Sequence, residues 1–113
     1  MQLFLLAAKG KITMSVADKN TRYYATPVWA TPNFYASVFL ILKGAEIVGV
    51  EKSKDNSGRS IFVFKDFPQR KEFLRQFNFA PEDSPETLID FRKAIAVIRN
   101  LKQKLYQERL ANL

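Results

Sequence analysis

The sequence contains no cysteine and no histidine. Without cysteine the chain has no disulfide framework and no thiol nucleophile, which fits a reducing interior, and we expect a cytoplasmic protein. Without histidine it lacks the commonest general base and the commonest metal ligand. Glycine is also scarce, and because its four glycines are scattered singly, the chain has no glycine-rich phosphate-binding loop.

The acidic residues do not form a pattern that is typical of a catalytic site. Only Glu82-Asp83 and Glu86-Asp90 cluster along the sequence. Both pairs surround an expected helix start, where acids complement the helix dipole. The serines have no base near them in the sequence. We therefore expect a protein that is not an enzyme, with no cofactor and no metal site.

No apolar run is long enough to cross a membrane, so we expect no membrane partner. The N-terminal run from Met1 to Ala8 ends at Lys9, so its charges follow the apolar stretch, whereas those of a signal peptide precede it. We interpret residues 1–22 as an N-terminal extension or edge strands. Met14 offers a second start, in which case residues 1–13 are an upstream extension.

The remaining composition indicates one globular domain over residues 23–113. The apolar fraction of 47% can supply a single core in a chain of 113 residues. The formal net charge is +7. A small domain of this charge is biased towards nucleic acid or an anionic surface.

Capping and turn residues predict a helix, a hairpin and a second helix. Thr31 as N-cap and Gly44 as C-terminal cap enclose an apolar helix over residues 31–43. Strands over residues 45–52 and 59–66 form a hairpin, in which Gly58 takes the left-handed position of the turn. A short helix follows over residues 68–77.

A long helix is predicted over residues 84–113, because Ser84-Pro85-Glu86 is a favourable helix start. Its apolar stripe has spacings of three and four: Leu88, Phe91, Ile95, Ile98, Leu101 and Leu105. We expect the half from Leu88 to Ile98 to pack on the sheet. The second half, through Leu101, Leu105 and Leu110, could pair with a second copy. The fold class is α+β: a small antiparallel sheet around a central hairpin, packed by helices, with a long C-terminal helix.

The strand over residues 59–65 is apolar on both faces and has a basic residue at each end. It invites comparison with the aromatic strand of RNA-recognition motifs, but Ser60 and Ile61 stand where that motif needs a glycine and an aromatic. Phe62 and Phe64 are therefore interpreted as core residues.

Candidates for base stacking lie in the proline-containing segment with Tyr23, Tyr24 and Trp29. The alternative, that Tyr24 and Trp29 cap the sheet, stays open. Bases outnumber acids by four to one in residues 1–30 and by six to three from Ser84 onward, but only by eight to seven in residues 31–83. The residues expected to meet phosphate are Lys19, Arg22, Arg59, Arg99, Lys102 and Lys104.

The order of these signals resembles a short uncharacterised domain family of bacteria, archaea and phages. The matching segments cover about residues 26–106: Thr26, Asn33-Phe34-Tyr35-Ala36, Gly44, Ile47 to Glu51, Phe62-Val63-Phe64 and Ile98 to Lys102. The family carries no established activity to transfer. The layout is also similar to that of small archaeal single-stranded-DNA-binding proteins, which join a compact sheet-and-helix body to a C-terminal dimerising helix.

The leading hypothesis is therefore non-catalytic binding of single-stranded DNA or RNA by basic and aromatic surface residues. The alternative is a protein-interaction or assembly module that forms a homodimer through the C-terminal helix and has no role with nucleic acid.

Overall fold

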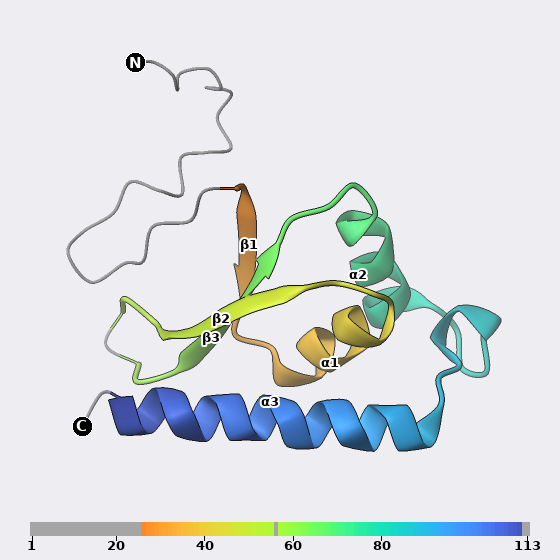
Figure 1. Ribbon diagram of the computed structural model, residues 1–113. Helices are drawn as coiled ribbons and strands as arrows, with labels where there is room; N and C mark the ends of the chain where they lie inside the picture. Colours follow the sequence, from red (N-terminus) through yellow and green to blue (C-terminus); the bar gives the residue numbers. More distant parts are fainter. Residues whose placement is uncertain (1–25, 56, 112–113) are drawn as a thin grey trace, which may run out of the picture.

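The computed structural model describes residues 26–55 and 57–111, which form an α+β domain (Figure 1). The elements in chain order are β1 Val28–Thr31, α1 Phe34–Leu42, β2 Ile47–Lys52, β3 Ser60–Lys65, α2 Arg70–Phe79, the short 3-10 helix η2 Pro85–Thr87, and α3 Phe91–Ala111. The predicted fold class, with its central hairpin and long C-terminal helix, is confirmed.

The apolar strand is the central strand of the sheet. The strand order is β1-β3-β2, and both neighbours run antiparallel to β3. Phe62 and Phe64 are buried, as predicted, and Val63 on the opposite face is buried as well. The hairpin turn contains Gly58 with a φ of 76°, the left-handed conformation that the sequence predicted for it.

The cap at the start of α1 differs from the prediction. Asn33 is the N-cap, because its side-chain oxygen accepts a hydrogen bond from the backbone N–H of Ala36 at 2.9 Å. Thr31 instead ends β1, and its hydroxyl accepts a hydrogen bond from the N–H of Asn33. The predicted cap at Gly44 is confirmed: its φ is 107°, and Gly44 and Ala45 donate back to Ile41 and Leu40 in a Schellman motif.

The core lies between the sheet and the helices. α1 packs against both α2 and α3, and α3 also packs against β2. One cluster of buried side chains joins these elements: Val38, Leu40, Val50, Phe62, Phe64 and Leu101. The C-terminal helix therefore contributes to the core from its middle, at Leu101, which is 1% exposed.

The start of the last helix corrects the sequence prediction. Ser84 caps only η2, accepting a hydrogen bond from the N–H of Glu86. The chain leaves the helical conformation at Leu88, and Asp90 then accepts from the N–H of Lys93 at 3.0 Å, which is the position of an N-cap for α3. The helix predicted over residues 84–113 is thus a 3-10 turn, a short extended link, and α3 over residues 91–111.

Two expectations for the packing of this helix are wrong. Leu88 and Phe91, expected to pack on the sheet, are 68% and 75% exposed. Leu101, expected to face a second copy, is buried in the core. Ile98 and Leu105 of the predicted apolar stripe do pack against the core cluster. The prediction therefore placed the beginning of the packed part too early along the helix.

Candidate nucleic-acid interface

Three basic side chains, Lys43 at the end of α1 and Arg70 and Arg75 of α2, have partners within the domain. Arg70 forms two hydrogen bonds to the carboxylate of Asp66, at 2.9 and 3.2 Å, and its guanidinium lies 4.9 Å from the centre of the Trp29 ring. The ammonium of Lys43 lies over two phenylalanine rings, at 5.3 Å from Phe39 and 5.5 Å from Phe73. These cations serve the fold, because their charges already face acceptors or rings.

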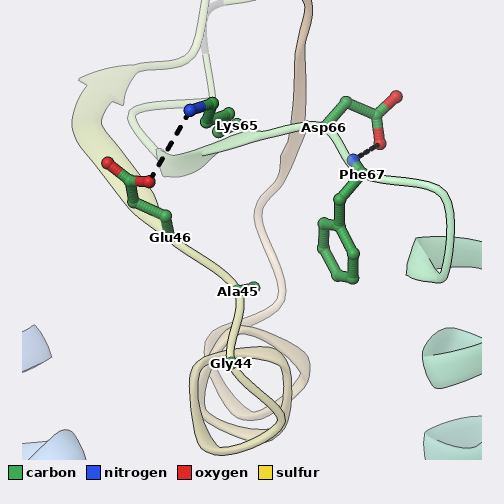
Figure 2. Close-up of a pocket in the computed structure, with 6 residues that line it drawn as sticks. All are labelled: Gly44, Ala45, Glu46, Lys65, Asp66 and Phe67. Carbon is green, nitrogen blue, oxygen red and sulfur yellow. Dashed lines mark hydrogen bonds and ion pairs between the residues drawn. The ribbon is translucent and has the colours of Figure 1, made fainter.

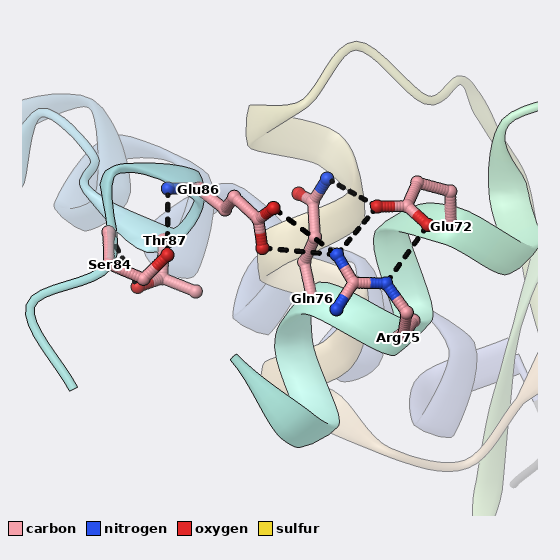
Figure 3. A network of polar contacts seen from close by, with 6 residues as sticks. All are labelled: Glu72, Arg75, Gln76, Ser84, Glu86 and Thr87. Carbon is pink, nitrogen blue, oxygen red and sulfur yellow. Dashed lines mark hydrogen bonds and ion pairs between the residues drawn. The ribbon is translucent and has the colours of Figure 1, made fainter. Parts of the chain in front are cut away.

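Arg75 is held by two acids at once (Figure 3). It donates to Glu72 in the same helix, at 2.7 and 3.0 Å, and to Glu86 of η2, at 3.1 and 3.2 Å. Hydrogen bonds from Arg75, and then from Gln76, lower the pKa of Glu72 to about 2. The network ties η2 to α2 and leaves Arg75 little capacity for an external anion.

A shallow pocket opens between the end of α1 and the end of β3 (Figure 2). Its volume is about 210 Å³, and its lining includes Glu46, Lys65 and Phe67. Glu46 faces Lys65 at 4.0 Å, and Asp66 accepts from the N–H of Phe67 as well as from Arg70. The polar groups of this pocket are engaged with one another, and they do not converge on a common point where a substrate would react.

The cations of α3 contrast with Lys43, Arg70 and Arg75. Residues 91–111 contain six bases and one acid, Glu108. Glu108 accepts a hydrogen bond from the hydroxyl of Ser60 at 2.9 Å. The six bases are exposed: Arg92, Lys93, Arg99, Lys102, Lys104 and Arg109. None of them forms an ion pair with another residue of the described ranges, so their charge is available to an external anion.

Three of these bases share one side of α3 with a tyrosine. Arg99, Lys102, Tyr106 and Arg109 follow one another at spacings of three, four and three residues, which places them within about 80° around the helix. We call these four residues the basic stripe. They extend over about 15 Å along the helix axis. Lys104 lies on the opposite border of the exposed surface, on the same side as Lys93, so the structure separates it from Arg99 and Lys102.

Tyr106 was missed in the sequence, where Tyr23, Tyr24 and Trp29 were chosen as the candidates for base stacking. Its side chain is 62% exposed. The available signal was its position four residues after Lys102 and three before Arg109, on a face that the core does not use. An exposed aromatic ring between cations is the combination that proteins use to bind single-stranded nucleic acid.

Arg59, in the hairpin turn, lies near the C-terminal end of α3. Ser60, its neighbour, donates the hydrogen bond to Glu108, which fixes the start of β3 against α3. Figure 1 shows the β2–β3 turn above the C-terminal end of α3. Arg59 itself is exposed, and its Nε contacts the Ser57 hydroxyl at 3.4 Å. The predicted phosphate contact Arg59 therefore lies at the same end of the molecule as Arg109.

Trp29 packs on the sheet. Its ring centre is 6.4 Å from that of Phe64, and Arg70 covers the ring. Of the two interpretations that the sequence left open, this packing supports the cap of the sheet over base stacking. The remaining expected contacts, Lys19, Arg22, Tyr23 and Tyr24, lie outside the described residues.

The three leucines expected at a dimer interface occupy different environments. Leu101 is a core residue, and Leu105 packs against the core cluster. Leu110 is 49% exposed. These residues therefore do not form one exposed seam along α3.

Over the part of the chain that the structure describes, no group of three acids is placed to hold a metal ion. No helix in these ranges is both long and apolar enough to cross a membrane.

A comparison with known families assigns the chain to one of them. The family described as Domain of unknown function (DUF5659) matches residues 28–107, which include every helix and strand from β1 to most of α3. The chain belongs to this family. No curated protein and no solved structure matches the chain.

Proposed function

We propose that this member of the DUF5659 family binds single-stranded nucleic acid, without catalysis, through the basic stripe of α3. The observation that carries the proposal is the contrast between two sets of cations. Lys43, Arg70 and Arg75 are paired with acids or rings, whereas Arg99, Lys102 and Arg109 face solvent without a partner in the described ranges. Lys71, exposed on α2, is a single cation outside both sets. Unpaired, clustered cations are the feature that binds a phosphate backbone.

Tyr106 favours a single strand as the ligand. Bases of a single strand are free to stack on an exposed aromatic ring, and each such stack contributes about 1–3 kcal/mol. Bases inside a duplex are already stacked on one another and do not offer a free face. Arg59 on the hairpin turn lies at the same end of the molecule as Arg109, and we expect a strand that lies along α3 to reach it.

The proposal is tested by fluorescence anisotropy with a labelled oligonucleotide of about ten nucleotides, alone and as a duplex, at two salt concentrations. We expect tighter binding of the single strand and a loss of affinity with salt. Tyr106→Ser should weaken binding of the single strand by about tenfold, whereas Tyr106→Phe should keep it, because phenylalanine retains the stacking face. No binding at low salt would reject the proposal.

The alternative function is an assembly module that forms a homodimer through the C-terminal helix. Only part of the interface expected for it is exposed. Leu110 stays exposed, while Leu101 is needed inside the domain. The mass of the chain in solution discriminates between the two: a stable dimer that has no affinity for oligonucleotides would favour assembly.

A further inference from the structure

The largest concentration of exposed apolar side chains lies away from the basic stripe, in the connection between α2 and α3. Phe79, Leu88, Ile89 and Phe91 are 77%, 68%, 45% and 75% exposed. Together they expose on the order of 500 Å² of side-chain surface, which is at the upper end of what monomeric proteins leave uncovered. We call residues 79–91 the α2–α3 connection.

The fold brings this connection back onto α2. Arg75 of α2 holds Glu86 at 3.1 Å, so Leu88 and Ile89, which follow Glu86, start close to α2. Phe79 lies one helical turn after Arg75. Figure 1 shows the end of α2, η2 and the beginning of α3 together at one end of the molecule.

The connection is also the acidic part of a basic protein. Residues 79–91 contain four acids and no base. Glu86 is paired with Arg75, and Asp90 caps α3 while its side chain stays exposed. Glu82 and Asp83 are exposed in a turn that is closed by a hydrogen bond from Ser84 N–H to the Pro81 carbonyl at 3.1 Å. A ligand for this surface should therefore combine apolar side chains with positive charge.

One segment of the chain has this composition. Residues 1–13 contain the apolar run Leu3-Phe4-Leu5-Leu6, followed by Lys9 and Lys11, and no acid. The 17 residues from Lys9 to Ala25 span about 56 Å when extended, more than the longest dimension of the domain, 49 Å. The tether is therefore long enough to bring Leu3 to Leu6 to the connection.

We propose that residues 3–11 of the chain dock on its own α2–α3 connection, with the apolar run on Phe79, Leu88 and Phe91 and the lysines towards Glu82 and Asp83. A short segment matches the size of this surface. A stable dimer requires about 800 Å² from each partner, which is more than these four apolar side chains expose. The docking is independent of the nucleic-acid function proposed above.

Amide hydrogen exchange on the full chain tests the docking. In the wild type we expect the amides of residues 3–8 to exchange about tenfold more slowly than free peptide. The double variant Phe79→Ser, Phe91→Ser should lose this protection. Tyr35→Ser is the matched control, because Tyr35 on α1 is 66% exposed and lies outside the connection; this variant should keep the protection.

The reciprocal variant changes the segment and observes the connection. Leu5→Asp should shift the NMR signals of Leu88, Ile89 and Phe91, because it removes the apolar contact without touching the described domain. The proposal is overturned if residues 3–8 exchange freely in the wild type, or if the double variant keeps their protection. It is also overturned if Leu5→Asp shifts Val28 and Val63 of the sheet instead, or if protection falls on dilution, since a second copy would then be the occupant.

Discussion

The hydroxyl of Ser60 donates a hydrogen bond to the carboxylate of Glu108 at 2.9 Å, and the two residues are 48 positions apart in the chain. The contact holds the C-terminal turns of α3 against the beginning of β3. It also engages the carboxylate of Glu108, which is the one acid of α3.

The Ser60–Glu108 contact should show a measurable coupling energy. In a double-mutant cycle with Ser60→Ala and Glu108→Ala, we expect about 1 kcal/mol of coupling in the free energy of unfolding. Glu108 makes a further interaction, so Glu108→Ala alone does not isolate the contact with Ser60. The single variant Glu108→Ala and the double variant both lose that further interaction, and its contribution therefore cancels in the cycle. Additive effects of the two substitutions would show that the contact does not form.

Leu101 should behave as a core residue and not as an interface residue. Because Leu101 is 1% exposed, Leu101→Ala should lower the free energy of unfolding by about 2–5 kcal/mol. Leu110→Ala, on the exposed part of the same helix, should change it by less than about 0.5 kcal/mol. Urea denaturation measures both, and equal effects of the two substitutions would contradict the packing of α3.

The start of α3 can be located by removing its cap. Asp90→Ala should cost about 1 kcal/mol, because it deprives the N–H of Lys93 of its acceptor. It should also speed amide exchange in the first turn after Phe91. Ser84→Ala removes the cap of η2 and should leave exchange in that turn unchanged; a larger effect there than that of Asp90→Ala would place the helix start at Ser84.

Arg75 should control the ionisation of Glu72. The pKa of Glu72 is lowered from 4.5 to about 2, so the stabilisation from this pair is complete above pH 4.5 and is lost as the pH falls towards 2. Arg75→Gln should return the pKa of Glu72 towards 4.5. A carboxylate NMR titration of wild type and variant measures the change, and an unchanged pKa would show that the guanidinium is not its cause.

The fold was largely predictable because its signals are local. Gly44 and Gly58 mark positions where the backbone needs a positive φ, and both were identified from the sequence. Phe62 and Phe64 of the apolar strand were predicted to be core residues, and both are buried in β3. The caps were less reliable, since Thr31 and Asn33 are both good caps. Thr31 pairs with Phe62 in the sheet, and Asn33 caps α1.

The candidate site was harder to predict because it depends on which side of α3 is buried. Leu88, Phe91 and Leu101 fit the same apolar periodicity, and the sequence does not tell which of them the core uses. Once Leu101 is known to be buried, the exposed side follows from helix geometry, and with it the grouping of Arg99 and Lys102 with Tyr106. Pairing between cations and acids, such as that of Arg75 with Glu86, joins distant elements and was not visible in the sequence.

The salt dependence of oligonucleotide binding tests the role of α3 most directly. The triple variant Arg99→Gln, Lys102→Gln, Arg109→Gln removes the cations of the basic stripe. Lys71→Gln is the matched control, since Lys71 is an exposed base on α2. For the triple variant we expect weaker binding and a slope of log K against log salt that is shallower by about 2, because each phosphate contact contributes about 0.7 with single strands. A triple variant with the slope and affinity of the wild type and of Lys71→Gln would contradict the proposed function of α3.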